Sequence, residues 1–236
     1  GVGETIFITL DAGTRKIKGE DLKLYFLITD TRDGGTSMKI AFTPVRVVCQ
    51  NTLVTGLKQS LVSVSLEHVA GLKVAFESRV ALVKRMVSAQ DATLSMFDQM
   101  AKLSLKKSDV DFVLNAAYPL PKKPKKASIL EDLDSDEEAK MIGVLYDEAS
   151  QANALWEYYC QRSYTLREAA SELYDKFNDE FPKTAKTGWA IYNAVVESAD
   201  FRRGNESVPV SAIWGARAQE KKRAFAAVSE LVGSKK

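Results

Sequence analysis

The sequence predicts an α+β fold, in which an antiparallel β-sheet comes first and helices follow. Up to about residue 70, apolar and polar residues alternate, as they do in strands with one buried face. From Leu72 the apolar residues instead recur every three or four positions, which is the spacing of one helix face. With 236 residues, 45% of them hydrophobic, the chain is long enough to bury a substantial core.

The first two strands are predicted from β-branched and aromatic residues in alternation. Residues 5–10 form the first strand, and residues 22–29 form the second. A turn region around Gly13 and Gly19 separates them.

A long hairpin is predicted next, because Asp33-Gly34-Gly35 supplies the positive φ angles of a hairpin loop. Residues 38–48 would return along the strand at 22–29. Pro44 has no backbone N–H to donate, which places that part of the return strand at a sheet edge or at a bulge.

The chain then changes from strands to helices. Asn51 or Thr52 is expected to cap a short helix that runs to about Ser60, and residues 62–66 alternate as in another strand. A long amphipathic helix of about thirty residues follows, ending near Ala101.

Prolines and capping residues divide the rest of the chain. Ser108 is expected to cap a short helix that ends before Pro119, and Pro119–Lys126 cannot continue it. Thr165 and Glu168 make a capping box. The remaining helices are predicted at 141–159, from Thr165 to before Pro182, from Thr187, and from Ser211 toward Val232. We therefore expect a core at 1–120, a charged linker at 121–136, and a helical subdomain at 137–236 that packs on the core.

Charge and cysteine content restrict the function. The chain has 33 basic and 31 acidic residues, so a polyanion would have to bind at a local basic face. Cys49 and Cys160 lie too far apart for a metal-binding motif, and we expect two free thiols in a reducing cytoplasm. No apolar run or signal peptide indicates a membrane. Because the chain starts at Gly1 rather than Met, we expect an upstream segment.

Several kinds of catalytic site are disfavoured. His68 is the single histidine and has no nucleophile motif beside it, and no glycine-rich phosphate loop is present. The acidic run at 131–138 lacks the spacing of a calcium loop. We expect no catalysis, no metal and no cofactor.

Basic residues lie on the hairpin and on the polar side of the long helix. The candidate phosphate contacts are Arg32, Lys39, Arg46, Arg79, Lys84 and Arg85, and the candidate stacking residues are Tyr25 and Phe42. Lys39 and Arg46 would share a sheet face only if a bulge at Pro44 shifted the alternation. These residues would then line a basic groove for single-stranded nucleic acid. The alternative remains that the cations only keep the sheet and helix hydrated.

Two segments stand out as motifs, Arg46–Leu53 (RVVCQNTL) and Gly188–Val195 (GWAIYNAV). The first contains Cys49, Asn51 and Thr52. In the second, Trp189 and Asn193 share a helix face, which usually faces a core. A buried Asn193 amide needs a hydrogen-bond partner, so it is predicted to tie its helix to the corner near Asn51.

Both motifs resemble a family of phage and plasmid proteins that carry a domain of unknown function. The predicted order of strand, long hairpin and helix is also similar to the core of single-strand annealing proteins of the recombination-mediator superfamily. That resemblance implies binding of single-stranded DNA, assembly into homo-oligomers and a role in recombination.

Our leading hypothesis is therefore a phage or plasmid protein in the bacterial cytoplasm that binds single-stranded DNA and anneals it. The alternative is an interaction factor that binds a host defence or replication protein, since the amphipathic helix could serve a partner.

Overall fold

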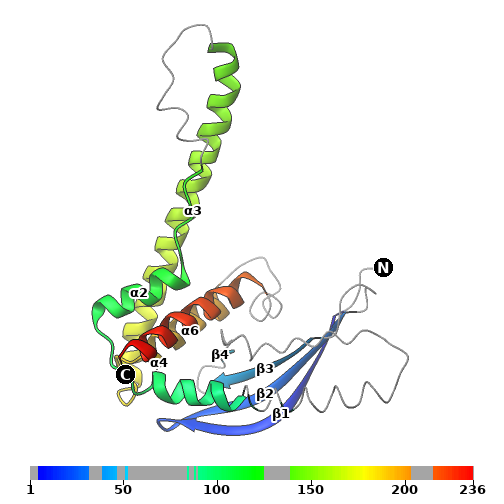
Figure 1. The fold of residues 1–236 in the computed structure, drawn as a ribbon, viewed down its shortest axis with the longest axis vertical. Coiled ribbons are helices and arrows are strands. Elements are labelled where there is room, and N and C mark those ends of the chain that lie inside the picture. Colours follow the sequence, from blue (N-terminus) through cyan, green and yellow to red (C-terminus); the bar gives the residue numbers. More distant parts are fainter. Residues whose placement is uncertain are drawn as a thin grey trace. The chain divides into compact units, whose positions relative to one another are not determined.

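The computed structural model describes residues 5–31, 39–46, 51–52, 84, 88, 90–124, 139–202 and 215–235. The chain divides into two compact units (Figure 1). Unit 1 contains residues 1–117 and 170–236, and unit 2 contains residues 118–169. The α+β class is confirmed, because a sheet at the N-terminal end precedes the helices.

The sheet of unit 1 has four antiparallel strands in the order of the sequence. They are β1 (Thr5–Ile17), β2 (Glu20–Thr31), β3 (Lys39–Arg46) and β4 (Asn51–Thr52). The pairing of β2 with β3 confirms the predicted hairpin, with a register that runs from Thr29 opposite Lys39 to Leu22 opposite Arg46. The loop between these two strands lies outside the described residues.

The first hairpin is longer than predicted because Gly13 lies within β1 rather than in a turn. The pairing with β2 shifts between Asp11 and Thr14, and Gly13 has a φ of 96° in this bulge. The turn itself is Lys18-Gly19, with φ values of 48° and 94°. Two positive φ angles are what a tight two-residue hairpin requires.

Pro44 lies at a sheet edge and not at a bulge. The register between β2 and β3 has no shift, and β4 pairs only with Val45 and Arg46. Among the described residues, no strand lies beside Pro44 on the β4 side. Asn51 and Thr52, one of which we expected to cap a short helix, pair with β3 as β4. A capping residue is itself extended, and the residues of that predicted helix lie outside the described part.

Residues 90–100 form the described end of the predicted long helix. The later helices are α2 (Lys107–Ala117), α3 (Ala139–Glu180), α4 (Gly188–Phe201) and α6 (Ala216–Ser234). As predicted, α2 ends before Pro119 and α3 before Pro182, while Thr187 caps α4 by accepting a hydrogen bond from Ala190 N at 3.3 Å.

One helix, α3, replaces the two that we predicted on either side of Thr165. The Thr165 hydroxyl donates to the Gln161 carbonyl at 3.1 Å. It is therefore bonded to the preceding turn, as a threonine inside a helix can be, and it does not start a new helix. The last helix begins after Gly215, and Ser211 lies outside the described residues.

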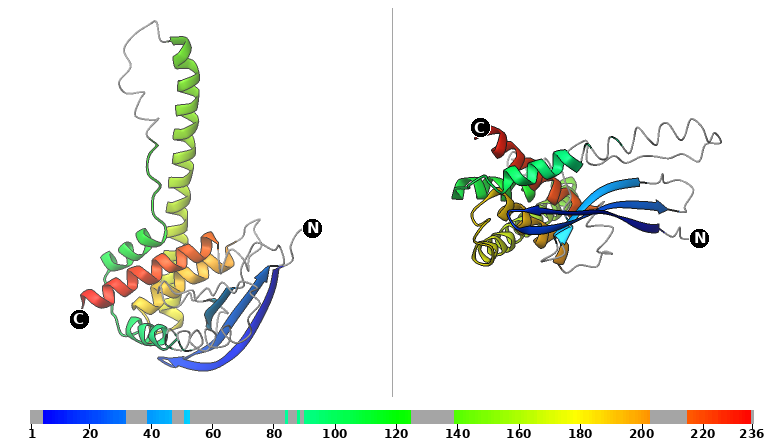
Figure 2. Two further views of the ribbon diagram at one scale, coloured as in Figure 1. Left: turned by 45° about the vertical axis from the view of Figure 1, so that its right-hand side comes forward. Right: turned by 90° about the horizontal axis from the view of Figure 1, so that it is seen from below.

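The core of unit 1 is built around α4, which packs against α6 and β4 (Figure 2). Eleven of its fourteen residues are buried. Its Trp189 and Tyr192 join a cluster of rings with Phe97 and Phe225, with centroids 5.1 to 6.4 Å apart. Because these rings come from three helices, the helices cannot separate without exposing them.

This packing changes the predicted domain division. We expected the helices of 137–236 to form one subdomain after a linker at 121–136, but α4, α6 and residues 170–180 of α3 belong to the same unit as the sheet. Unit 2 is instead the segment 118–169. Within it, Trp156 and Ser163 of α3 donate to the carbonyls of Pro121 and Pro119 at 3.0 and 3.2 Å.

Candidate functional site

The predicted phosphate contacts are only partly within the described structure. Arg32, Arg79 and Arg85 lie outside it, as does Cys49. Lys39 and Arg46 belong to β3, but only their backbone is described. Because β3 is uninterrupted, positions 39 and 46 lie on opposite faces of the sheet, so the bulge that a shared basic face required is absent. Lys84 is helical and exposed.

The two predicted stacking residues are on opposite faces of the sheet. Tyr25 pairs with Thr43, whereas Phe42 pairs with Phe26. The Phe42 ring is only 5% exposed and lies 5.7 Å from the Phe26 ring. Phe42 therefore packs within the fold, and only Tyr25, which is half-buried, has a ring that a ligand can reach.

Near its turn, the first hairpin buries Ile17, Leu22 and Leu24 on one face and carries lysines on the other. We call the second the outer sheet face. Its exposed or half-buried members are Thr9, Asp11, Thr14, Lys16, Asp21, Lys23 and Tyr25, whereas Leu27 on the same face is buried.

Lys23 is exposed two positions before Tyr25, on the same face. Lys16 is also exposed, and its ammonium lies 3.7 Å from Asp21. Sequence reasoning missed Lys16 because it placed the turn of the first hairpin around Gly13 as well as Gly19. It missed Lys23, which lies in the predicted strand 22–29, because it sought basic residues on the second hairpin and the long helix. Continuing the alternation up to Gly19 would have found Lys16.

The second motif connects α4 to the first hairpin. Trp189 is completely buried, and its indole N–H donates to Glu20 Oε2 at 3.4 Å. The Thr184 hydroxyl donates to the other carboxylate oxygen, Oε1, at 2.8 Å. The motif therefore fixes the tip of the hairpin against the start of α4.

Asn193 is buried, as predicted, and its described hydrogen bond stays within its own helix, while the corner to which it was predicted to bond lies largely outside the described residues. The residue is 0% exposed, but its amide nitrogen donates to the Trp189 carbonyl at 2.9 Å, within its own helix. Among the described residues, Asn193 Oδ1 has no hydrogen-bond partner. The two motif segments do meet, because α4 packs against β4 at Asn51 and Thr52.

Gly188 explains the first position of this motif. A Cβ at this position would lie 2.7 Å from Val228 Cγ1 and 3.2 Å from the Met100 carbonyl oxygen. Only glycine lets α4 approach α6 this closely.

A family model for a domain of unknown function, DUF932, matches residues 1–229. The chain belongs to the DUF932 family. This confirms the predicted resemblance to a family defined by a domain of unknown function. No curated protein and no solved structure matches the chain.

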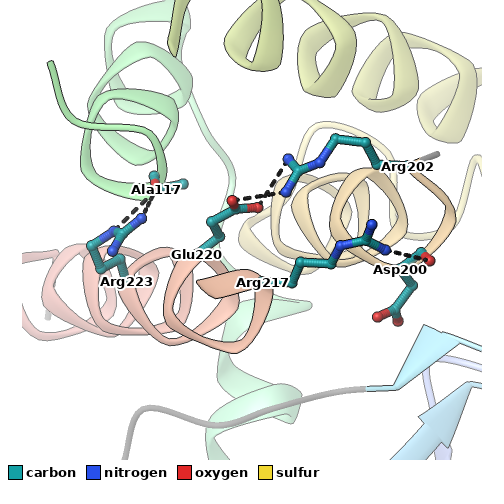
Figure 3. A network of polar contacts seen from close by, with 6 residues as sticks. All are labelled: Ala117, Asp200, Arg202, Arg217, Glu220 and Arg223. Atoms are coloured by element: carbon teal, nitrogen blue, oxygen red, sulfur yellow. Dashed lines mark hydrogen bonds and ion pairs between the residues drawn. The ribbon is translucent and has the colours of Figure 1, made fainter. Parts of the chain in front are cut away.

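In this DUF932 chain, a network of charged residues joins the end of α4 to the start of α6 (Figure 3). Arg202 binds both carboxylate oxygens of Glu220, at 3.0 and 3.2 Å. Arg217 donates to the Asp200 carbonyl at 3.5 Å, and Arg223 donates to the Ala117 carbonyl at 2.7 and 3.0 Å. The network connects α4, α6 and α2.

Lys221 of α6 is paired with Asp200 and is 0% exposed. Burial lowers the pKa of the Lys221 ammonium, although the neighbouring Asp200 opposes that shift. A side chain this deeply enclosed cannot meet a ligand, so the pair is a contact between α4 and α6 and not a binding site.

The described residues of this DUF932 chain also bear on metal binding, on thiol chemistry and on membrane insertion. Within the described ranges, no three His, Cys, Asp or Glu side chains gather where a metal ion could bind. Cys160 has a free thiol, as predicted, and Cys49 is outside those ranges. None of the described helices combines the length and apolarity needed to cross a membrane.

Proposed function

We propose that the protein binds single-stranded DNA along the outer sheet face and carries out no catalysis. The observation that supports this most is the row of Lys16, Lys23 and Tyr25 on one sheet face, where the two lysines are exposed and the tyrosine is half-buried. Ammonium groups contact phosphates, and an aromatic ring stacks on a base whatever its sequence. The net charge of the chain is only +2, so the protein as a whole attracts DNA little. A local face with these side chains would supply the attraction.

The proposal includes the cellular setting. The protein would be a phage or plasmid product in the bacterial cytoplasm, and homo-oligomers of it would anneal complementary strands during recombination. Two resemblances support this part: that of the motifs to phage and plasmid proteins, and that of the strand order to single-strand annealing proteins. The second is a likeness of fold and does not by itself carry a function.

Binding of a labelled single strand and of its duplex, measured by fluorescence anisotropy over a salt series, tests the proposal. We expect the single strand to bind more tightly, with an affinity that falls by a log-log slope of about 0.7 for each phosphate contacted. Lys23→Glu should weaken binding, whereas Lys122→Glu, which changes an exposed lysine of unit 2, should not. Binding that is independent of salt, or absent at low salt, would refute it.

A second function is favoured by exposed apolar side chains on α3 in unit 2. Leu155, Tyr158 and Tyr159 are 54%, 60% and 45% exposed, and Arg162 is exposed beside them. Tyrosine and arginine are common in protein interfaces. This surface would let the protein bind a host defence or replication protein.

Native mass spectrometry separates the two functions. A complex with an oligonucleotide that survives Tyr159→Ser supports DNA binding. Failure to bind any oligonucleotide, together with capture of a host protein that Tyr159→Ser abolishes, supports the interaction factor.

A further inference from the structure

Three segments distant in sequence meet at the tip of the first hairpin. They are the Lys18-Gly19 turn, residues 182–187 before α4, and residues 101–106 before α2 (Figure 2). The turn is held to the second segment by the bond from Thr184 to Glu20. The second is held to the third by two backbone bonds of 2.9 Å, from Leu105 N to the Lys186 carbonyl and from Gly188 N to the Leu103 carbonyl.

Each of these segments carries lysines. We call the following five the lysine cluster: Lys18, Lys102, Lys106, Lys183 and Lys186, all of which are exposed. The Lys183 ammonium lies 3.9 Å from the place that a Cβ on Gly19 would occupy, which brings it against the turn. Lys18 and Lys186 both have positive φ angles, 48° and 54°.

Within the described residues, the lysines of this cluster form no ion pair, although the charge of Lys106 does act on the Asp109 carboxylate. In the described part of the chain, no carboxylate lies within ion-pairing distance of any of the five. Nearby acids are already engaged, since Asp109 accepts from Lys235 at 2.6 Å and Asp98 lies 3.4 Å from Arg15. Like charges held together by fixed backbone create a local positive potential that an anion would relieve.

The cluster continues the outer sheet face. Lys16 is a member of that face and lies two positions before Lys18 in the turn. A strand lying along Lys23 and Lys16 would therefore meet the lysine cluster when it passes the tip of the hairpin.

We propose that the lysine cluster is a second contact region for the sugar-phosphate backbone of the DNA strand bound at the outer sheet face. The inference rests on the proposed function and extends it. Lysine ammonium groups act as point charges, so this region adds affinity and site length but reads no sequence.

The test compares the wild type with three variants on a short and a long oligo(dT), of about 8 and about 30 nucleotides, since a single-strand site commonly covers roughly 4–16. The triple variant is Lys18→Asn, Lys183→Gln and Lys186→Asn, because asparagine tolerates positive φ. The control variant neutralises three exposed lysines outside the cluster, Lys122→Gln, Lys123→Gln and Lys176→Gln.

For the long oligonucleotide, we plot the logarithm of affinity against the logarithm of salt concentration. We expect the slope of this plot to become shallower by about 2 in the triple variant, because each of its three lost contacts removes about 0.7. The short oligonucleotide and the control variant should keep the wild-type slope. Lys102→Gln with Lys106→Gln, in an ordinary backbone conformation, should give a smaller change in the same direction even if the triple variant folds poorly.

The outcomes separate this inference from the proposed function. If the wild-type protein binds no oligonucleotide at low salt, both are overturned. If binding depends on Lys23 while both cluster variants keep the wild-type slope, only the inference is overturned. Equal losses in the cluster and control variants would also overturn it. Polyglutamate serves as a probe for acidic proteins: a triple variant that lost polyglutamate binding but kept the wild-type salt slope on DNA would overturn the inference and assign the cluster to an acidic protein.

Discussion

The indole N–H of Trp189 donates to the Glu20 carboxylate at 3.4 Å, across 169 positions of sequence. This bond joins the tip of the first hairpin to the start of the most buried helix. Both proposed DNA contact regions depend on it, because the outer sheet face leads to that tip and the lysine cluster surrounds it.

Replacing Glu20 should therefore destabilise unit 1. Glu20→Ala leaves the buried indole N–H of Trp189 without its acceptor, which costs about 1–3 kcal/mol. The Thr184 hydroxyl loses its 2.8 Å bond and keeps the longer one, of 3.5 Å, to the Phe181 carbonyl. Urea unfolding followed by tryptophan fluorescence measures the loss. Asp111→Ala, at an exposed position of α2, is the control and should change the free energy of unfolding little.

Two glycine substitutions should have opposite effects. Gly188→Ala forces a contact with Val228 and should destabilise the protein by about 1–3 kcal/mol. Gly233→Ala in α6 meets nothing within 4 Å and should stabilise it by about 0.5–1 kcal/mol. Thermal unfolding compares the two, and Val228→Ala combined with Gly188→Ala should recover part of the loss. Equal effects at both glycines would contradict the close approach of α4 and α6.

The buried pair of Lys221 and Asp200 predicts a large effect from a single change. Lys221→Met leaves the Asp200 carboxylate without its ammonium partner, and losses of about 3–5 kcal/mol are typical when one member of a buried pair is removed. Lys222→Met, one position along α6 and half-buried, provides the comparison. Chemical denaturation that found both variants equally stable would contradict the pairing.

Asp109 should make stability depend on acidity. The hydrogen bond from Lys235 holds the pKa of the Asp109 carboxyl below its usual value of 3.8, aided by the Lys106 backbone N–H. A carboxyl with a lowered folded pKa contributes stability above pH 3.8, and this contribution is lost as the pH falls through the folded value. The stability difference between wild type and Asp109→Asn should thus be present at neutral pH and shrink below pH 3.8. A difference constant over that range would rule out the ion pair.

Tyr25 should matter for binding and Phe42 for folding. Tyr25→Ala should weaken binding of single-stranded DNA by about 1–3 kcal/mol through lost stacking, while Tyr25→Phe should retain it. Phe42→Ala should destabilise the protein instead, because its ring is packed against Phe26. Anisotropy and denaturation, measured on all three variants, distinguish these roles. Unchanged affinity in Tyr25→Ala would remove the ring from the proposed site.

Local patterns predicted the parts of the fold that local interactions decide. The pairing of β2 with β3 followed from alternation and from the Asp33-Gly34-Gly35 loop, and Thr187 was identified as a cap from its own chemistry. The capping box at Thr165 failed because the same side chain can also bond to the preceding helical turn, and only the flanking residues decide between the two.

The candidate site depended on contacts that no local pattern contains. Lys18, Lys183 and Lys106 lie in three separate connecting segments, each of which resembles an ordinary solvated loop. Their proximity follows from the bonds of Glu20 and Lys186, which join positions far apart in sequence. The prediction of the groove failed in part because it assumed a bulge at Pro44. A proline at a sheet edge needs no bulge, because no neighbouring strand there requires the N–H that proline lacks.

A helix enclosed on nearly every side, as α4 is, leaves evolution few acceptable replacements. Sequence similarity in Gly188-Trp189 and the residues after it therefore indicates that two proteins share this fold. Exposed positions such as Lys23 and Lys183 are under no such packing constraint, and relatives could exchange them to suit other ligands. Two proteins of this family could thus share an interior and differ in their biological role.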